Sequence, residues 1–465
     1  MVFSSLFFIF RFLPVFFLIY YLTPRRYKNC ILLLGSLFFY GYGCFIEKFE
    51  PGYFVYFVCL IFINFISAIM ISMQEKKFVR KLTLALIMML DLGGLFVFKY
   101  FDFFTGDVLG RDDFILGLTL PLGISFYTFQ LISYVVDVYR GKYKPERHLV
   151  SFSAYIAMFP QLIAGPIVKY DEVRKKMRRR NVTLADAESG ACLFCMGLGS
   201  KVILANNLYT LWNTTTTIGI PYMSLAYSWL CAIALSMYIY FDFWGYSLMA
   251  MGLGQMLGFK IPENFNAPYI SRSFTEFWRR WHMTLGRFFK EYVYIPLGGS
   301  RVSKIRLIFN LLVVWALTGL WHGAAYNFII WGLMFFVLLG IEKLFMLKIF
   351  DRVHILGHIY TLVLIPVSWV IFTITDLKTL LVYLGNMIGI RSGEAMTNAM
   401  VLKDTLSDYW WLLLLGAVMC TALPINLYKM LRGKLLQSVI SFVIFWISVY
   451  LLFRGVDNPF LYFRF

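Results

Sequence analysis

Apolar runs of about 18 to 25 residues recur along the whole chain, and a helix needs roughly that length to cross the hydrocarbon core of a bilayer. Hydrophobic residues occupy 60% of the 465 positions and charged residues only 15%, which is more apolar surface than a soluble core can hide. These features exclude a soluble globular protein. They predict an all-α, polytopic membrane protein with a single membrane domain over residues 1–465.

The apolar runs predict about 11–12 transmembrane helices, together with one re-entrant and one interfacial element. The first run is longer than the apolar part of a signal peptide and has no small-residue cleavage pattern, so we expect it to be retained. The expected spans are 2–22, 29–46, 53–73, 82–104, 120–139, 191–212, 222–241, 307–321, 324–341, 356–375, 409–428 and 435–453.

The net charge of +18 is concentrated in loops on one predicted side of the membrane. Loops 23–28 and 74–81 are basic and loop 105–113 is acidic, so the positive-inside rule places the N-terminus outside. Because cytoplasmic loops account for the charge, nucleic-acid binding has no support. Seven scattered cysteines show no zinc-type or disulfide spacing, and the pair Cys192 and Cys195 lies in an apolar run typical of packing.

Segment 149–168 breaks the alternation of loop charge because both of its flanks are basic. Its core contains Pro160, Gly165 and Pro166, which interrupt a helix. Interrupted backbone at membrane depth persists only where it is buried in protein or lines a wet cavity. We therefore predict a re-entrant element here.

Two of the five histidines, His282 and His322, have unusual surroundings. About 16 mostly apolar residues separate His322 from the basic start of its run, so it lies roughly 24 Å along a helix, deep in the bilayer or near its outer side. An ionisable group at that depth lines a pathway or is a neutral core histidine, and depth alone does not decide between them. The flanking Gly319 and Gly323 favour function, since they let another backbone or a substrate approach.

Residues 274–292 predict an interfacial amphipathic helix with an aromatic face and a basic face. His282 lies at the edge of the aromatic face and is expected to point into the protein. The basic face carries Arg279 and Arg280 and suits anionic lipid headgroups, which we favour, or the phosphates of a cytosolic donor such as a coenzyme A ester.

Charged residues also fall within or beside the predicted spans, and salt bridges between helices are the usual explanation for them. These residues are Arg11, Asp91, Lys99, Asp137, Lys201 and Asp242.

Several long motifs in one order resemble the membrane-bound O-acyltransferase family, and most closely its alginate O-acetyltransferase branch. The motif-bearing core is about 120–341, and the ending 458–465 is also similar to that branch. The motifs are LPLGISF at 120–126, FPQLIAGP at 159–166, FDF at 241–243, NFNAPY at 264–269, FWRRWH at 277–282, YIPLGG at 294–299 and LWHG at 320–323.

The resemblance implies helices around a thinned central cavity, with an acyl donor arriving from the cytosol and an acceptor from outside. It assigns His322 as the catalytic base. It also makes His282 a catalytic-site residue at the second family position, where histidine or asparagine is found, with the role of holding the donor or orienting His322. Candidate substrate-binding residues on the matching motifs and basic face are Trp321, Trp278, Arg279, Arg280, Gln161 and Asp242.

The implied function is transfer of an acetyl group from a cytosolic thioester, acetyl-CoA or another acyl thioester, for O-acetylation of an extracellular or cell-wall polysaccharide. No permanently bound cofactor or metal is expected. The implied partner is an extracytoplasmic acetyltransferase of the SGNH-hydrolase type, and the implied location is the bacterial cytoplasmic membrane.

Three alternatives stay open at this point. A D-alanyl transfer protein for teichoic acids shares the histidine motifs but takes its acyl group from a carrier protein. A secondary transporter is suggested by the buried charges and the broken segment 149–168, although no repeat of hydrophobic segments appears. A non-catalytic scaffold would recruit the extracellular enzyme without needing His322.

Overall fold

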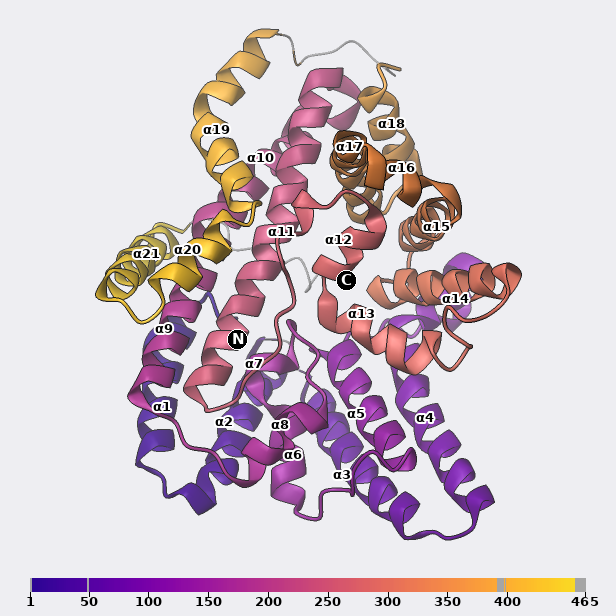
Figure 1. The fold of residues 1–465 in the computed structure, drawn as a ribbon, viewed down its shortest axis with the longest axis vertical. Coiled ribbons are helices and arrows are strands. Elements are labelled where there is room, and N and C mark those ends of the chain that lie inside the picture. The colour runs from indigo at the N-terminus through magenta and orange to yellow at the C-terminus, as the bar shows by residue number, and fades with distance from the viewer. Residues whose placement is uncertain (1, 48–49, 391–396, 398, 456–465) are drawn as a thin grey trace. The chain divides into compact units, whose positions relative to one another are not determined.

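The computed structural model describes residues 2–47, 50–390, 397 and 399–455, and every regular element among them is a helix (Figure 1). This confirms the all-α, polytopic prediction. Among these described residues, nine helices are long and apolar enough to cross a membrane, or ten if one bent pair counts as a span. The nine are Arg25–Glu47, Pro51–Met73, Lys77–Lys99, Leu184–Ile218, Leu225–Met256, Lys304–His322, Tyr326–Arg352, His354–Thr373 and Leu435–Phe453.

The described residues give nine or ten candidate spans where the sequence predicted 11–12, because two expected spans form helices shorter than 18 residues. The apolar helix Phe8–Leu22 falls below 18 residues. The expected span 120–139 becomes a helix only from Ile124, because Gly123 has a left-handed φ of 72° and directly faces the carbonyl oxygen of Leu162. The resulting helix α5 (Ile124–Tyr139) has 16 residues and is buried along almost its whole length.

The expected straight span 409–428 is bent. It forms α19 (Ala399–Met419) and α20 (Leu423–Leu431), whose axes differ by 69°. Pro424 lies in the first turn of α20, where its missing N–H leaves no helical bond unmade. A turn at residues 420–422 therefore ends one helix and starts another within a single apolar run.

The chain divides into two compact units, Met1–Phe194 with Tyr246–Pro262, and Cys195–Gly245 with Glu263–Phe465. Two of the three boundaries fall within α9 (Leu184–Gly199) and α11 (Leu225–Met256), and the third lies in the loop after α11. Whether they form one functional membrane domain over residues 1–465 stays a prediction.

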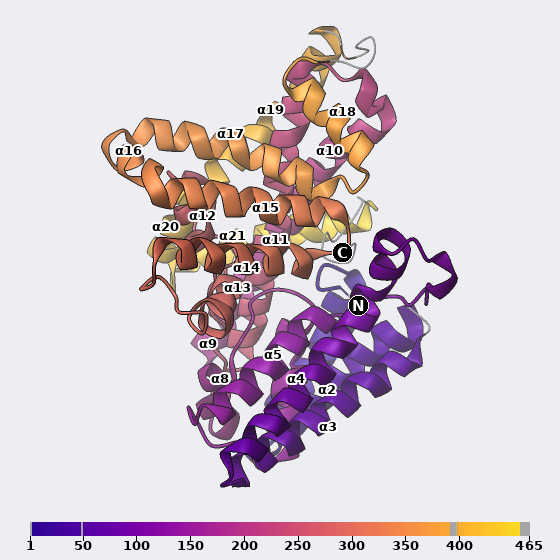
Figure 2. The same ribbon diagram turned by 90° about the vertical axis from the view of Figure 1, so that its right-hand side faces the viewer.

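In the first unit, α3 (Pro51–Met73), α4 (Lys77–Lys99) and α5 pack pairwise against one another (Figure 2). Helix α2 (Lys28–Tyr42) packs on α6 (Leu149–Ala157). Large apolar side chains such as Met89 remain exposed along these helices, as expected for surfaces that face lipid. The other helices of this unit are α1 (Leu13–Leu22), α7 (Phe159–Leu162) and α8 (Tyr170–Arg178).

Segment 149–168 is broken where the sequence predicted. Helix α6 ends at Ala157, and the four-residue α7 begins at Phe159 with Pro160 in its first turn. Residues 152–170 are buried, so their interrupted backbone is shielded by protein. That the segment is re-entrant stays a prediction.

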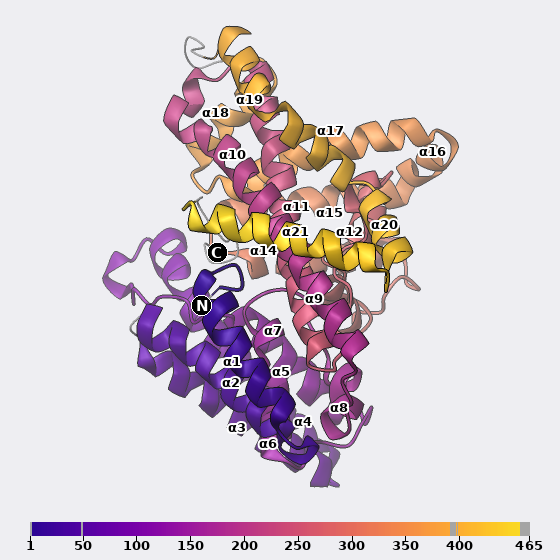
Figure 3. The same ribbon diagram turned by 90° about the vertical axis from the view of Figure 1, so that its left-hand side faces the viewer.

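In the second unit, α14 (Lys304–His322), α15 (Tyr326–Ile341) and α17 (His354–Thr373) are stacked one on another (Figure 2). Helix α21 (Leu435–Phe453) packs on the π-helical segment Ser200–Ala205 that follows α9 (Figure 3). The remaining helices of this unit are α10 (Asn206–Ile218), α12 (Phe274–Arg280), α13 (Met283–Phe289), α16 (Leu347–Arg352) and α18 (Leu377–Met387).

Candidate active site

The single amphipathic helix predicted over 274–292 is broken at His282. Helix α12 ends at Arg280, α13 starts at Met283, and His282 between them has φ 43° and ψ 50°. A left-handed backbone costs a residue with a Cβ about 1–2 kcal/mol, so the surroundings must hold His282 in place. The amphipathic pattern survives the break, since Trp281 and Phe288 are buried while Arg279 and Lys290 are exposed.

Asn264 secures the break from a distant part of the chain. Its backbone carbonyl accepts the N–H of Met283 at 3.0 Å, and its side-chain Oδ1 accepts the N–H of Thr284 at 3.2 Å. These are two of the N–H groups that the start of a helix leaves without a helical partner. The same Oδ1 accepts the Thr284 hydroxyl at 2.9 Å and lies 3.2 Å from Nδ1 of His282.

His282 points into the protein, as predicted, and is only 2% exposed. Its ring meets Phe243 of α11 edge to face, with centroids 4.7 Å apart. Burial lowers the pKa of His282 to about 3, because an apolar environment disfavours the charged imidazolium. The imidazole is therefore neutral at physiological pH.

His322 is the last residue of α14 and is 8% exposed. Its ring packs against Trp331 on α15 at 5.1 Å and against Phe372 on α17 at 5.0 Å. The neighbouring Trp321 lies 4.8 Å from His322 and 5.8 Å from His282, measured between ring centroids. The two predicted histidines thus share one indole as a neighbour.

The position of His322 depends on close packing between α14 and α15. A Cβ added to Gly319 would lie 2.5 Å from the Phe328 carbonyl oxygen, and one added to Gly332 would lie 2.6 Å from the Trp315 carbonyl oxygen. Such distances are closer than real Cβ contacts allow, so both positions require glycine. The sequence predicted that Gly319 lets another backbone come close, and in the structure this is the backbone of α15.

The candidate binding residues on α12 have different surroundings. Trp278 packs edge to face on Trp331 at 5.6 Å and therefore belongs to the aromatic cluster around His322. Arg279 is exposed. Arg280 is bound within the protein, because it pairs with Glu276 at 2.9 Å and donates to the Asn266 carbonyl at 3.1 Å.

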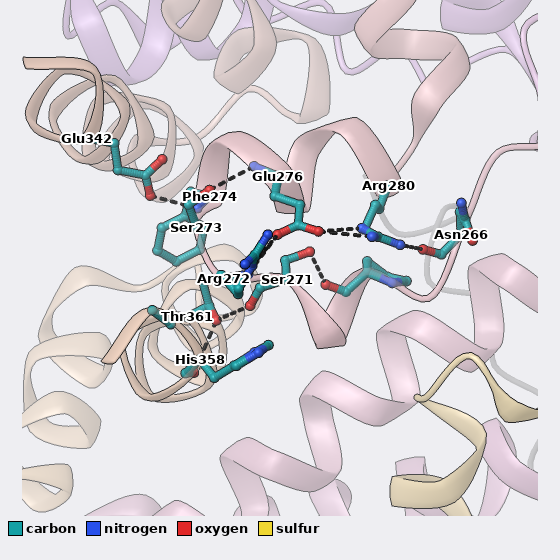
Figure 4. A network of polar contacts seen from close by, with 12 residues as sticks. Asn266, Ser271, Arg272, Ser273, Phe274, Glu276, Arg280, Glu342, His358 and Thr361 are labelled. Carbon is teal, nitrogen blue, oxygen red and sulfur yellow. Dashed lines mark hydrogen bonds and ion pairs between the residues drawn. The ribbon is translucent and has the colours of Figure 1, made fainter. Parts of the chain in front are cut away.

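A polar network holds α12 in its orientation (Figure 4). The buried Glu342 carboxylate accepts the N–H groups of Phe274 and Thr275 at 2.6 and 2.8 Å, at the start of α12. Thr361 of α17 donates to the Ser271 carbonyl at 2.6 Å (Figure 4). Helix α12, which directly precedes His282 in the chain, is therefore anchored to the helices that surround His322.

Asp242 forms an ion pair with Lys201 at 2.7 Å, and each side chain is 1% exposed. This confirms the expectation of a structural salt bridge for these two charges. Gln161, another candidate binding residue, belongs to the first unit, where its Nε2 donates to the Tyr155 carbonyl at 2.6 Å.

Sequence reasoning gave no site role to Asn264, Thr284, Phe243, Trp331 or Phe372, although all five surround the histidines. Asn264 and Phe243 lie in the family motifs NFNAPY and FDF, and membership of these motifs is the sequence feature that could have indicated a site role. Trp331 and Phe372 lie in apolar runs without any distinguishing pattern. In the part of the chain that the structure describes, no three or more His, Cys, Asp or Glu side chains are grouped to hold a metal ion.

Comparison with known proteins agrees with the motifs. Residues 146–384 match the profile of the MBOAT, membrane-bound O-acyltransferase family. The chain is 38% identical to the probable alginate O-acetylase of Azotobacter vinelandii over 388 residues, covering 81% of this chain and 76% of that protein. It is 33% identical to the peptidoglycan O-acetyltransferase of Helicobacter pylori, covering 84% and 80%. The teichoic acid D-alanyltransferase of Bacillus subtilis is 32% identical over 48% of this chain and 59% of its own length.

Proposed function

Since this chain belongs to the membrane-bound O-acyltransferase family, and so is an O-acyltransferase, we propose that it transfers acetyl groups for O-acetylation of an extracellular or cell-wall polysaccharide. The donor is a cytosolic thioester, acetyl-CoA in the simplest case. The polysaccharide is suggested by the relatives that cover most of the chain, which are named for alginate and peptidoglycan O-acetylation. The D-alanyl alternative is weaker, because that relative matches under half of the chain.

The observation that carries the proposal is the pair of buried histidines on one indole, at the end of α14 and at the break between α12 and α13. His322 takes the proton from the attacking hydroxyl while its oxygen bonds to the thioester carbonyl carbon. The C–S bond then breaks, and the proton passes to the departing sulfur to give a free thiol and an acetyl ester. The aromatic walls of Trp331 and Phe372 keep water from the thioester.

The proposal places the protein in a bacterial cytoplasmic membrane with an extracytoplasmic partner of the SGNH-hydrolase type. A multi-pass fold supports the membrane location, and the relatives named above are bacterial. The partner is proposed because the activated acetyl group originates in the cytosol and the polymer lies outside.

The test measures ester-linked acetyl on surface polysaccharide in cells lacking the gene. These cells are complemented with wild type, His322→Ala, His282→Ala or His354→Ala at matched membrane levels. His354 is an exposed histidine at the start of α17 and serves as the control. We expect wild type and His354→Ala to restore acetyl and His322→Ala to restore none. Full restoration by His322→Ala would favour the scaffold alternative, and restored D-alanine without acetyl would favour the D-alanyl branch.

A further inference from the structure

The hydrogen bonds around Asn264 determine which nitrogen of His282 carries the proton. The backbone N–H of Thr284 can only donate, so the Asn264 atom that faces it, and also faces His282, is the amide oxygen. An amide oxygen can only accept, so Nδ1 of His282 must be the donor across the 3.2 Å contact. In a neutral imidazole, a proton on Nδ1 leaves Nε2 with a bare lone pair.

That lone pair is buried and unused. Nε2 of His282 is shielded from solvent and has no hydrogen-bond partner among the residues that the structure describes. Leaving a buried acceptor unpaired is costly, and a strained backbone at the same residue adds to that cost. A fold that keeps both features at one residue points to a ligand that completes the bond.

We propose that Nε2 of His282 binds the amide N–H of the donor's thiol arm, and that Asn264 is a positioning residue that holds His282 in the tautomer this requires. The inference rests on the proposed function. The attacking hydroxyl has a single hydrogen, which is committed to His322, so Nε2 must take its hydrogen bond from another group. Thiol arms of the pantetheine type carry an amide N–H two carbons from the sulfur.

Among the residues that the structure describes, burial alone lowers the pKa of His282, and no charged side chain of the flanking helices contributes to the shift. The side chains that contact the His282 ring include Phe243, Asn264 and Trp321, none of which ionises near neutral pH, and the titratable group that shares Trp321 as a neighbour is His322. Nε2 therefore stays a bare acceptor from about pH 5 to pH 9.

Full-length protein in lipid nanodiscs, with ¹⁵N-labelled histidine rings, tests the tautomer without any turnover. Subtracting the spectrum of His282→Gln assigns the His282 signals. We expect a protonated Nδ1 and a bare Nε2 that do not change from pH 5 to 9. A protonated Nε2 would overturn the proposal even if the enzyme is active, which keeps its failure separate from failure of the proposed function.

The ligand is tested with S-acetyl-N-acetylcysteamine and its analogue in which an ester oxygen replaces the amide N–H. The amide compound should shift the Nε2 resonance and the ester compound should not. In an assay of the free thiol released from each donor, the kcat/KM of wild type should be about tenfold higher for the amide compound than for the ester compound. His282→Phe should lose that preference. Equal shifts with both compounds, or none with either, would refute the proposal.

Variants of Asn264 test its positioning role. Asn264→Ala should populate both tautomers and reduce the preference for the amide donor. Asn264→Asp places a carboxylate against Nδ1 and favours the imidazolium, so its preference should be lost at low pH and return at high pH. The control is Asn266→Ala in the same motif, because the Asn266 side chain is exposed. An Asn264→Asp enzyme with the pH profile of wild type would rule out the positioning role.

Discussion

The contact between α14 and α15 can be tested with two glycine-to-alanine changes in the same helix pair. In Gly319→Ala the new Cβ meets the Phe328 carbonyl oxygen at 2.5 Å, and backbone cannot move aside cheaply. In Gly340→Ala the nearest atom is the Ile308 Cδ1 at 3.8 Å, an ordinary contact. Both variants gain the helix propensity of alanine, up to about 1 kcal/mol, so this gain cancels between them.

The remaining difference is the cost of forcing the helices apart, about 1–3 kcal/mol for an overpacked interior. We expect Gly319→Ala to be less stable than Gly340→Ala by that amount in reversible unfolding in mixed micelles. The rate at which this variant releases thiol from the donor should fall as well, because the displaced helix α14 carries His322 three residues after Gly319. Adding Gly332→Ala to Gly319→Ala should cost less than the sum of the two changes, since the helices have already separated. Equal stability of Gly319→Ala and Gly340→Ala would refute the close approach.

Three further changes test the polar contacts. Asp242→Asn should destabilise the protein by about 3–5 kcal/mol in the same unfolding assay by leaving Lys201 buried without its counter-charge, and Asp242→Leu combined with Lys201→Met should recover most of that loss. Glu342→Ala should lower the melting temperature more than Glu342→Gln, because alanine leaves the donors at the start of α12 unsatisfied whereas glutamine still offers an oxygen. Burial acts to raise the pKa of Glu276, but hydrogen bonds from Arg272 and Arg280 outweigh it and hold the pKa below its ordinary value. The stabilisation from this carboxylate is therefore complete above the unfolded-state pKa and is lost as the pH falls through the folded-state pKa, so the melting temperatures of wild type and Glu276→Gln should converge as the pH falls through that range.

The sequence predicts most of the membrane helices because a hydrophobic run of bilayer length has few other ways to satisfy its backbone. It overcounts them at Phe8–Leu22 and at α5, because apolar composition does not reveal where a helix begins. The 69° bend between α19 and α20 is missed for the same reason, since the apolar run continues through the turn.

Motifs and depth in the membrane identify the two histidines, but they do not reveal the residues that hold these histidines in place. The backbone of His282 is left-handed, whereas the helical periodicity of 274–292 runs through it and no glycine or proline lies within three positions of it to signal a break. Asn264 acts on His282 from 18 positions away, and Lys201 pairs with Asp242 across 41 positions. Pairings of this kind follow from tertiary packing, which local propensity does not encode.

The indole of Trp321, which neighbours both histidine rings, gives the protein an internal optical reporter. A protonated imidazole in contact with an excited indole quenches its fluorescence by accepting charge, whereas a neutral imidazole does so far less. Because His282 stays neutral, a pH-dependent change in the emission of Trp321 reports the protonation of His322. The difference in emission between wild type and Trp321→Phe therefore offers a direct titration of the proposed catalytic base in the absence of substrate.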